Sequence, residues 1–276
     1  MKPHAVERAE RLVGSTAESW ARVVRTGYSL NEHWTVVFAD GMNAFVKTAR
    51  IAPSPQWLRD EHAVLAAVSG PHMPRLLAFE DADEPLLLLE DLMPARWPPP
   101  WREGDVQAVL TALGEISALQ APLPRLADDP GWNGWRTIES DPQPFLSTGL
   151  RDAAWLERML PALVAAADAT PLAGDGLLHC DVRSDNLCLK DGRAVLVDWN
   201  HARLGDARFD IAFWLPSLVL ERGPKPKHFD VDAYAALVAG FFAAHAGLPK
   251  PAGAPTVRAF QRAQAAVALD WAEAVL

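Results

Sequence analysis

The stretch "LLHCDVRSDNLCL", residues 177–189, has the leucine-rich ends of a buried strand and a polar middle. Six polar side chains fall within eight positions: His179, Asp181, Arg183, Ser184, Asp185 and Asn186. Burying so many polar groups costs on the order of several kcal/mol unless each finds a partner. A strand that opens into such a loop and then closes again therefore indicates a functional site.

The length and composition of the chain set broad limits. Its 276 residues fit one large domain or two lobes, and a charged fraction of 22% indicates a globular protein. The net charge of −9 argues against a nucleic-acid partner and is compatible with a cationic ligand. With only two cysteines, Cys180 and Cys188, we expect reduced thiols and no disulfide framework.

The hydrophobic pattern does not predict a membrane partner. The first residues have no long apolar core, so we expect no signal peptide. The longest apolar run, "IAFWLPSLVL", is too short to span a bilayer and contains Pro216. These features predict a soluble, cytoplasmic protein.

The N-terminal third of the chain reads mainly as sheet. Residues of about 18–49 alternate as strands do, with a hairpin turn at Asp40-Gly41. A helix is expected over about 54–68, followed by two strands in "PRLLAFED" and "PLLLLED". The proline-rich residues 94–104 cannot form regular structure, so they mark the end of this part.

The remainder of the chain reads mainly as helix. Helices are expected over about 105–120, 152–168, 207–221, 230–246 and 255–276. One pair of short strands, "LCLK" and "RAVLVDW", interrupts them and is joined by a turn at Asp191-Gly192. A sheet-rich part therefore precedes a helical part, and the join lies near residues 90–95.

Two charged residues lie where apolar side chains are expected. Glu61 falls on the apolar stripe of its helix, and Lys47 shares a strand face with Phe45. A buried ion pair between them would satisfy both charges and leave the lysine able to meet an anion. The alternative is that both side chains extend to water.

The polar loop carries groups that handle protons and metal ions. Asp181 and Asn186 are five residues apart, and Asp198 ends the strand "AVLVD" twelve residues further on. Phosphoryl transfer needs a carboxylate that accepts the proton of the acceptor, and oxygen ligands for Mg²⁺. This spacing therefore favours phosphoryl transfer.

The motif H-x-D-x-x-x-x-N, followed by "DW" and "GDARFDIAFW", resembles the aminoglycoside phosphotransferase family. The resemblance extends from about Val23 to the C-terminal helix. It implies an α+β, bilobal protein-kinase-like fold: an N-lobe of antiparallel sheet plus one helix, and a mostly helical C-lobe. The lobes would comprise residues 1–91 and 105–276, joined by a hinge and proline-rich crossover at 92–104.

The resemblance implies a nucleotide site in the N-lobe. Lys47 would contact the phosphates of ATP and pair with Glu61, and backbone groups near Glu90 to Leu92 would hold the adenine. The segment "RTGYSLNEHW" has a single glycine where protein kinases have three. Gly27 and Ser29 are candidates for covering the phosphates, and the alternative is an ordinary hairpin loop. A preference for ATP over GTP is not predicted.

The resemblance also assigns roles in the polar loop. Asp181 would be the catalytic base or would orient the acceptor hydroxyl, and His179 would brace the loop. Asn186 and Asp198 would bind Mg²⁺. Arg183 and Asp185 lie outside the resemblance, because many relatives carry other residues there. Arg183 is expected to meet a phosphate or an acidic neighbour, and the alternative is an internal contact with Asp185.

The acceptor site is the least specified part of the prediction. Candidate lining residues in the C-lobe are Asp210, Trp214, Glu221, Asp270 and Trp271. Asp210 also resembles the aspartate that ties the catalytic loop to a following helix. An acidic and aromatic wall suits a cationic small molecule, although aromatic residues are more often core.

These features predict an ATP-dependent small-molecule kinase that phosphorylates a hydroxyl, with an aminoglycoside or amino sugar as the leading acceptor. A metabolic alcohol such as choline, homoserine or another sugar is an alternative acceptor. A non-catalytic nucleotide-binding regulator is the alternative from another class of protein. No activation segment follows Asp198, which argues against a protein substrate. The sequence does not indicate an oligomeric state.

Overall fold

The computed structural model describes residues 1–24, 31–251 and 255–276 of the chain, which pack into two units. Unit 1 comprises Met1–Pro98, Gly104–Leu123 and Asp185–Ala202. Unit 2 comprises Pro99–Glu103, Pro124–Ser184 and Arg203–Leu276. Each unit is therefore built from segments that are distant in sequence, and the polar loop is divided between the two.

Unit 1 contains a five-stranded sheet in which all neighbouring strands are antiparallel. The strand order is β1-β2-β3-β5-β4, with bounds Ala17–Arg22 for β1, Glu32–Phe38 for β2, Asn43–Thr48 for β3, Leu76–Glu80 for β4 and Leu86–Glu90 for β5. The predicted turn at Asp40-Gly41 joins β2 to β3 and is confirmed. Gly41 has the positive φ of 83° that glycine adopts readily in a tight turn.

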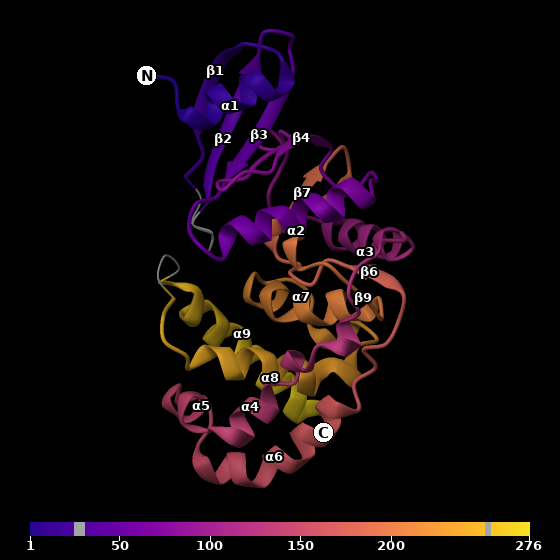
Figure 1. Cartoon of the computed structure of the whole chain (residues 1–276). Coiled ribbons are helices and arrows are strands. Elements are labelled where there is room, and N and C mark those ends of the chain that lie inside the picture. The colour runs from indigo at the N-terminus through magenta and orange to yellow at the C-terminus, as the bar shows by residue number, and fades with distance from the viewer. Residues whose placement is uncertain (25–30, 252–254) are drawn as a thin grey trace. The chain divides into compact units, whose positions relative to one another are not determined.

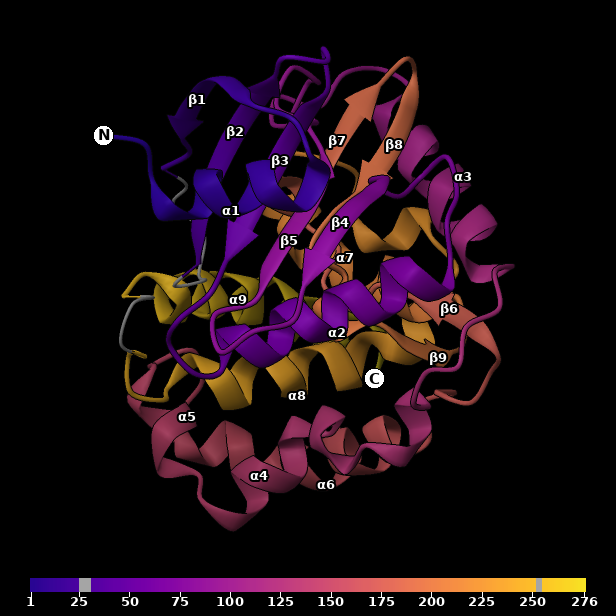
Figure 2. The ribbon, with the colours of Figure 1, turned by 45° about the horizontal axis from the view of Figure 1, so that its top comes forward.

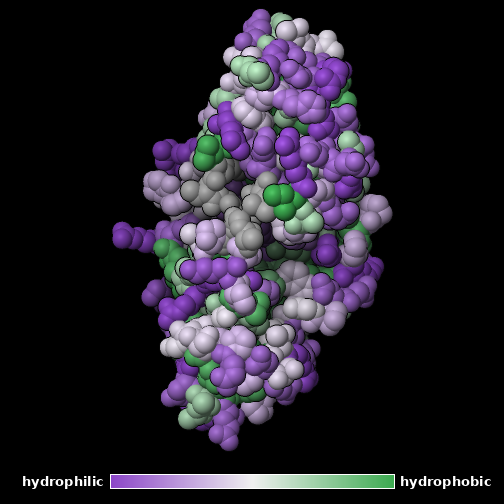
Figure 3. Space-filling view, turned by 60° about the vertical axis from the view of Figure 1, so that its left-hand side comes forward, coloured by the Kyte–Doolittle hydropathy of each residue, from purple (hydrophilic) through white to green (hydrophobic). Residues whose placement is uncertain are grey.

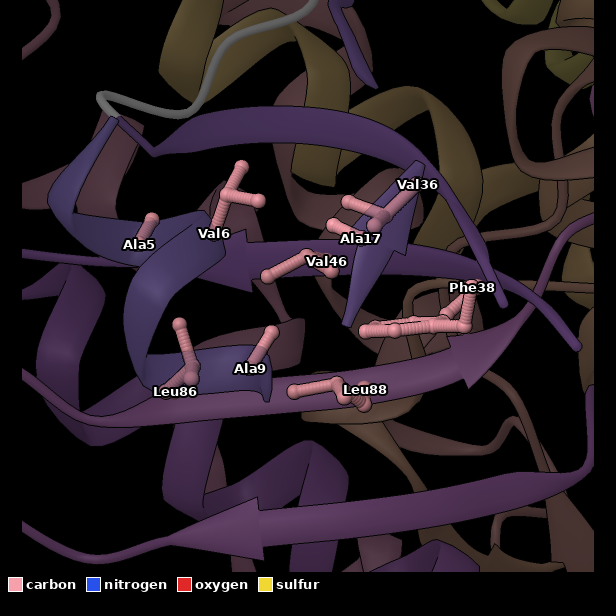
Figure 4. Close-up of a cluster of buried hydrophobic side chains, with 10 residues drawn as sticks. Ala5, Val6, Ala9, Ala17, Val36, Phe38, Val46, Leu86 and Leu88 are labelled. Atoms are coloured by element: carbon pink, nitrogen blue, oxygen red, sulfur yellow. The ribbon is translucent and has the colours of Figure 1, made fainter. Parts of the chain in front are cut away.

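The two faces of this sheet carry different side chains. On β3, Ala44 and Val46 belong to a hydrophobic core, whereas Phe45 and Lys47 line a pocket. This division follows the two-residue period of a strand. Helix α1, His4–Val13, covers the core face (Figure 2). Figure 4 shows the core between them, which consists of Ala5, Val6, Ala9, Ala17, Val36, Phe38, Ala44, Val46, Leu86 and Leu88.

A second hairpin in unit 1 comes from much later in the sequence. It consists of β7, Leu187–Lys190, and β8, Arg193–Leu196. The predicted turn at Asp191-Gly192 is confirmed, since these residues have φ values of 51° and 76°. The backbone N–H of Leu196 donates to the carbonyl of His72 at 2.9 Å, and α3, Asp105–Ser117, packs against β8. This hairpin therefore packs with the N-terminal segments.

Helix α2, Ser54–Ala67, completes unit 1 and buries the predicted stripe that includes Leu58, Glu61 and Leu65. It packs against the short 3₁₀ turn η4, Trp199–His201, which comes much later in the sequence. The rings of Trp57 and His201 meet edge to face. The helix therefore connects the N-terminal sheet with the residues that follow β8.

Unit 2 is mostly helical. Its helices are α4, Gly134–Ser140; α5, Gln143–Ser147; α6, Ala153–Asp168; α7, Arg208–Leu220; α8, Ala235–Ala246; and α9, Val257–Val275. Helix α8 is hydrophobic on all sides and is buried among α4, α5, α6 and α9 (Figure 1). The short strands β6, Gly176–Leu178, and β9, Arg203–Gly205, form an antiparallel pair that leads into the polar loop.

Short 3₁₀ turns connect these elements. They are η1 at Leu126–Asp128, η2 at Pro130–Trp132, η3 at Ser184–Asn186, η5 at Pro226–His228 and η6 at Asp232–Tyr234.

The predicted fold class is confirmed: an antiparallel sheet in the N-terminal part and mostly helices in the C-terminal part. The five helices expected beyond residue 104 correspond to α3, α6, α7, α8 and α9, although α8 begins only after η6. Among the described α-helices and strands, α4, α5 and β9 were not predicted, and each has seven residues or fewer. The N-terminal part also contains helix α1, in addition to the single helix that the resemblance implied for the N-lobe.

Across the described ranges, no helix is both long and apolar enough to cross a bilayer. The face seen in Figure 3 is mostly hydrophilic, with hydrophobic side chains scattered between polar ones. Cys180 and Cys188 are both buried, and neither forms a disulfide.

Two adjacent valines on β2 provide a test of the sheet core. Val36 is 1% exposed and faces α1, whereas Val37 is 38% exposed. We expect Val36→Ala to lower the free energy of unfolding by about 2 kcal/mol, because it removes buried methyl groups and leaves a cavity. Val37→Ala is the matched control and should change it by less than about 0.5 kcal/mol. Equal urea midpoints for the two variants would contradict this arrangement.

Candidate active site

Lys47 and Glu61 form a buried ion pair in unit 1. The Lys47 Nζ atom donates to both carboxylate oxygens of Glu61, at 2.9 and 2.8 Å. The side chains are only 4% and 3% exposed. The predicted pairing is therefore confirmed. It brings a residue of β3 against the buried face of α2.

Asp198 shares the same ammonium group. Lys47 Nζ also donates to Asp198 Oδ1, and the Asp198 side chain is 40% exposed. Asp198 follows β8 and has a φ of 66°, a left-handed conformation that aspartate tolerates better than most residues. Two carboxylates thus contact one ammonium, which leaves a net negative charge. Asp198, the more exposed carboxylate, places part of this charge at the surface of unit 1.

Burial and charge act in opposite directions on these groups. Burial lowers the pKa of the Lys47 ammonium, but the carboxylates of Asp198 and Glu61 outweigh this effect and raise it. Lys47 therefore stays charged. Burial raises the pKa of the Glu61 carboxyl, and the nearby charge of Asp198 adds to this, while Lys47 opposes both.

Asn186 lies at the same end of the β7–β8 hairpin as Asp198. The backbone N–H of Val197 donates to the Asn186 carbonyl at 2.8 Å, directly beyond the last paired residues of the two strands. Asn186 is 4% exposed. The hairpin therefore brings an amide and a carboxylate, both predicted metal ligands, to one end of a short ladder.

This pair of oxygen donors suits a hard cation held mainly by a substrate. In the described part of the chain, no group of three or more His, Cys, Asp or Glu side chains could hold a metal ion. Mg²⁺ commonly uses only one or two protein carboxylates, with phosphate oxygens and waters completing its shell. The surplus negative charge around Lys47 fits such a cation.

A pocket lies beside this cluster in unit 1. Its lining consists of Phe45, Lys47, Pro74, Leu89, Glu90, Leu92, Val197 and Asp198. The predicted hinge residues Glu90 and Leu92 therefore belong to this pocket. The carboxylate of Glu90 accepts a hydrogen bond from Lys190, which lowers the pKa of Glu90 against the raising effect of burial. Gly27 and Ser29 lie outside the described residues.

The part of the polar loop in unit 2 is held by Asp210. This carboxylate accepts hydrogen bonds from the backbone N–H groups of His179, at 2.7 Å, and Cys180, at 2.8 Å. Asp210 is 2% exposed and lies in the first turn of α7. Cys180 has a φ of 62°, so these two bonds hold a strained turn immediately before Asp181.

Asp181 lies partly exposed after this turn. Its backbone N–H donates to Nδ1 of the fully buried His179 at 3.3 Å, and Arg183 Nη1 donates to Asp181 Oδ1 at 3.0 Å. Arg183 was expected to meet a phosphate or an acidic neighbour, and Asp181 is one such neighbour. The proposed base is thus held from both sides by residues of its own loop.

The five residues suggested for the acceptor have different environments. Asp210, Trp214 and Trp271 are buried, so they offer little surface to a bound molecule. Trp271 donates to Asp232 at 2.8 Å. Asp270 is exposed and accepts a hydrogen bond from Arg151 at 2.8 Å.

Glu221 contacts the polar loop, as Asp210 does, but further along the chain. It accepts hydrogen bonds from the hydroxyl of Ser184 and from the indole N–H of Trp101. Sequence reasoning missed this connection, since 37 residues separate Ser184 from Glu221 and 120 separate Trp101 from it. Only the polar character of Ser184 within the loop could have suggested it.

Comparisons with known proteins identify the relatives of this arrangement. Residues 21–260 match the sequence profile described as "Phosphotransferase enzyme family". A comparison with curated proteins gives no match.

Several solved structures share the fold. Spectinomycin phosphotransferase APH(9)-Ia, with ADP and spectinomycin, has a TM-score of 0.62 at 12% identity, covering 98% of this chain and 97% of that one. Amicoumacin kinase hAmiN, with AMP-PNP, Ca²⁺ and Ami, has a TM-score of 0.60 at 13% identity, covering 94% and 91%. An ethanolamine kinase of Plasmodium vivax has a TM-score of 0.59 at 9% identity, covering 94% and 82%. These likenesses confirm the protein-kinase-like fold.

Asp210 should make the stability of the protein depend on pH. Burial raises the pKa of its carboxyl from 3.8 to about 6, against the lowering effect of its two backbone hydrogen bonds. Between these values the folded state binds the proton more tightly than the unfolded state, so stability falls as the pH rises. We expect wild type to lose about 2 kcal/mol relative to Asp210→Asn between pH 4 and pH 7, because one pKa unit corresponds to about 1.4 kcal/mol.

Unfolding by urea across this pH range would measure the effect. Asp128→Asn, at an exposed position of unit 2, is the control and should follow the wild-type pH dependence. A constant difference between wild type and Asp210→Asn would contradict the raised pKa.

Proposed function

The chain belongs to the phosphotransferase enzyme family, and we propose that it transfers the γ-phosphoryl group of ATP to a hydroxyl of a small molecule. The observation that carries this proposal is the buried Lys47 ammonium, held between Glu61 and Asp198 at the edge of a mostly apolar pocket. A charged lysine that is fixed beside such a pocket suits a ligand with an apolar ring and an anionic tail.

We assign the purine and phosphates of ATP to this pocket. The side chains of Phe45, Leu89 and Leu92 offer apolar surface to the faces of the base. The phosphates would extend toward Lys47, whose charge is maintained by its two carboxylate partners. Gly27 and Ser29 would cover the phosphates, as the sequence predicts.

The residues that would hold Mg²⁺ are Asn186 and Asp198. Both belong to unit 1. Asp198 is the exposed carboxylate of the cluster that also contains Glu61 and the Lys47 ammonium. When bound, Mg²⁺ supplies neutralising charge for the phosphate oxygens. Asp198 has a second role toward Lys47, since together with Glu61 it raises the pKa of the ammonium against the lowering effect of burial.

We propose that Asp181 accepts the proton of the acceptor hydroxyl or orients that hydroxyl. Arg183 contacts its carboxylate, His179 braces its backbone, and Asp210 anchors the preceding turn. The lobes at residues 1–91 and 105–276, with a hinge and crossover at 92–104, are part of the same proposal. They are a functional division and do not coincide with the two packing units.

An aminoglycoside or amino sugar is the leading acceptor, and a metabolic alcohol is the alternative. Similar structures carry the names of an antibiotic phosphotransferase and of an ethanolamine kinase, so the shared fold accommodates both kinds. The surplus of acidic residues and the net charge of −9 favour a cationic acceptor. We further propose that the protein acts in the cytoplasm.

The proposed base is tested by Asp181→Asn, which removes the carboxylate and retains its size. We expect acceptor-dependent turnover to fall by roughly 10²- to 10⁴-fold, with Mg·ATP affinity nearly unchanged. ADP release would be measured across a panel of aminoglycosides, amino sugars and simple alcohols. Turnover equal to wild type would exclude Asp181 from this role. If the wild-type protein binds Mg·ATP but releases no ADP with any acceptor, the result would favour the alternative function, a non-catalytic nucleotide-binding regulator.

The metal assignment is tested by calorimetric titration of ATP with and without Mg²⁺. We expect Asp198→Ala to weaken the Mg²⁺-dependent affinity by roughly 10- to 100-fold, a loss comparable to that seen when a metal site loses a supporting group. Asp83→Ala, an exposed carboxylate in the same unit, is the matched control. If both variants bind Mg·ATP as wild type does, Asp198 is not a metal ligand.

A further inference from the structure

Helix α7 places a carboxylate at each of its ends. Asp210 lies in the first turn, and Glu221 is the residue that caps the C-terminus. They are eleven positions apart in the sequence, which corresponds to about 16 Å along a helix axis. Both carboxylates contact the polar loop, so the helix meets the loop at two separate points.

The contacts of Glu221 use both of its oxygens. Oε1 accepts the hydroxyl of Ser184, and Oε2 accepts the indole N–H of Trp101 at 2.8 Å. Ser184 is 8% exposed. The ring of Trp101 also packs against Trp214 of α7, with ring centroids 5.4 Å apart. Glu221 is therefore held within a packed group, and its oxygens meet two neutral donors.

These contacts lie on both sides of the proposed base, Asp181, in the sequence. Asp210 holds the backbone at residues 179 and 180, and Glu221 holds residue 184. Only residues 181–183 lie between the two anchors. Three residues cannot shift far between two fixed ends, so the carboxylate of Asp181 is placed by α7 on both sides.

The partners of Glu221 also lie at points where the chain passes between the units. Ser184 is the last residue of unit 2 before Asp185 continues in unit 1. Trp101 belongs to Pro99–Glu103, a five-residue segment of unit 2 that is flanked on both sides by unit 1. One carboxylate therefore binds two segments that enter unit 2 from different parts of the sequence.

We propose that Glu221 is a positioning residue, which fixes the second end of the polar loop through Ser184 and so sets the placement of Asp181. This inference rests on the proposed phosphoryl transfer, in which Asp181 meets the acceptor. It assigns Glu221 a role different from that of an acceptor ligand. A base displaced by about 1 Å can lose on the order of 10²-fold in rate, so the second anchor has a measurable effect.

Two substitutions of Glu221 separate the two roles. In Glu221→Gln, the amide oxygen can accept from Trp101 and the amide N–H can donate to the Ser184 hydroxyl, so both contacts survive without the charge. In Glu221→Ala, both contacts are lost. We expect kcat to fall by roughly 10- to 100-fold in Glu221→Ala, to stay within about twofold of wild type in Glu221→Gln, and the KM for ATP to stay constant in both.

A double-mutant cycle identifies the partner through which Glu221 acts. We expect Ser184→Ala to lower kcat nearly as much as Glu221→Ala, and the double variant to show no further loss. Trp101→Phe removes only the other hydrogen bond and should affect kcat less. Glu157→Ala, an exposed glutamate of unit 2, is the control and should behave as wild type.

Hydrogen exchange provides a readout that needs no acceptor. Backbone amides of residues 177–189 should exchange at least about tenfold faster in Glu221→Ala and Ser184→Ala than in wild type, and Glu221→Gln should retain the protection. If wild type shows no acceptor-dependent ADP release, the proposed function fails, while this exchange pattern still decides whether Glu221 anchors the loop.

Two results would overturn the proposal. The first is wild-type kcat and wild-type exchange in Glu221→Ala. The second is a raised KM for a cationic acceptor in Glu221→Gln with unchanged kcat and exchange, which would identify Glu221 as an acceptor ligand. Because Glu221→Gln and Ser184→Ala are conservative, they decide the question even if Glu221→Ala does not fold.

Discussion

A lysine ammonium buried among apolar side chains must be compensated by carboxylates, and this constraint organises unit 1. Lys47 lies on β3, Glu61 on α2, and Asp198 follows β8, so three distant segments have to meet at one atom. Breaking a buried ion pair by removing one partner typically costs about 3–5 kcal/mol, which makes this meeting point structurally demanding. It explains why the hairpin of β7 and β8 belongs with the N-terminal sheet.

A comparable constraint acts in unit 2, where helix α7 supports the polar loop. The loop exposes backbone N–H groups at a strained turn, and the buried carboxylate of Asp210 accepts two of them. Its raised pKa reflects the cost of burying that charge. The polar loop is thus compensated in part by the carboxylates at the two ends of α7, since Asp210 accepts two of its backbone N–H groups and Glu221 accepts the hydroxyl of Ser184.

Much of the fold was predictable because its signals are local. The alternation around Phe45 and Lys47 gives a strand with one core face, and the turns at Asp40-Gly41 and Asp191-Gly192 use residues that adopt positive φ readily. Short elements such as α4 and α5 escaped, since five to seven residues show too little periodicity to be recognised. In the site, the charges at Lys47 and Glu61 were conspicuous because a lone buried charge is costly.

The sequence by itself determined which residues carry charge into apolar surroundings, and the spacing of Asp181, Asn186 and Asp198 that relates the chain to phosphotransferases. The tertiary structure decided how those residues are held. Only folding showed that Lys47 is shared by a second carboxylate, that Asp210 accepts from the backbone N–H groups of both His179 and Cys180, and that Glu221 binds Ser184. The physical reason is that hydropathy and turn preferences act between near neighbours. Hydrogen bonds between residues far apart in sequence exist only once packing has brought them together.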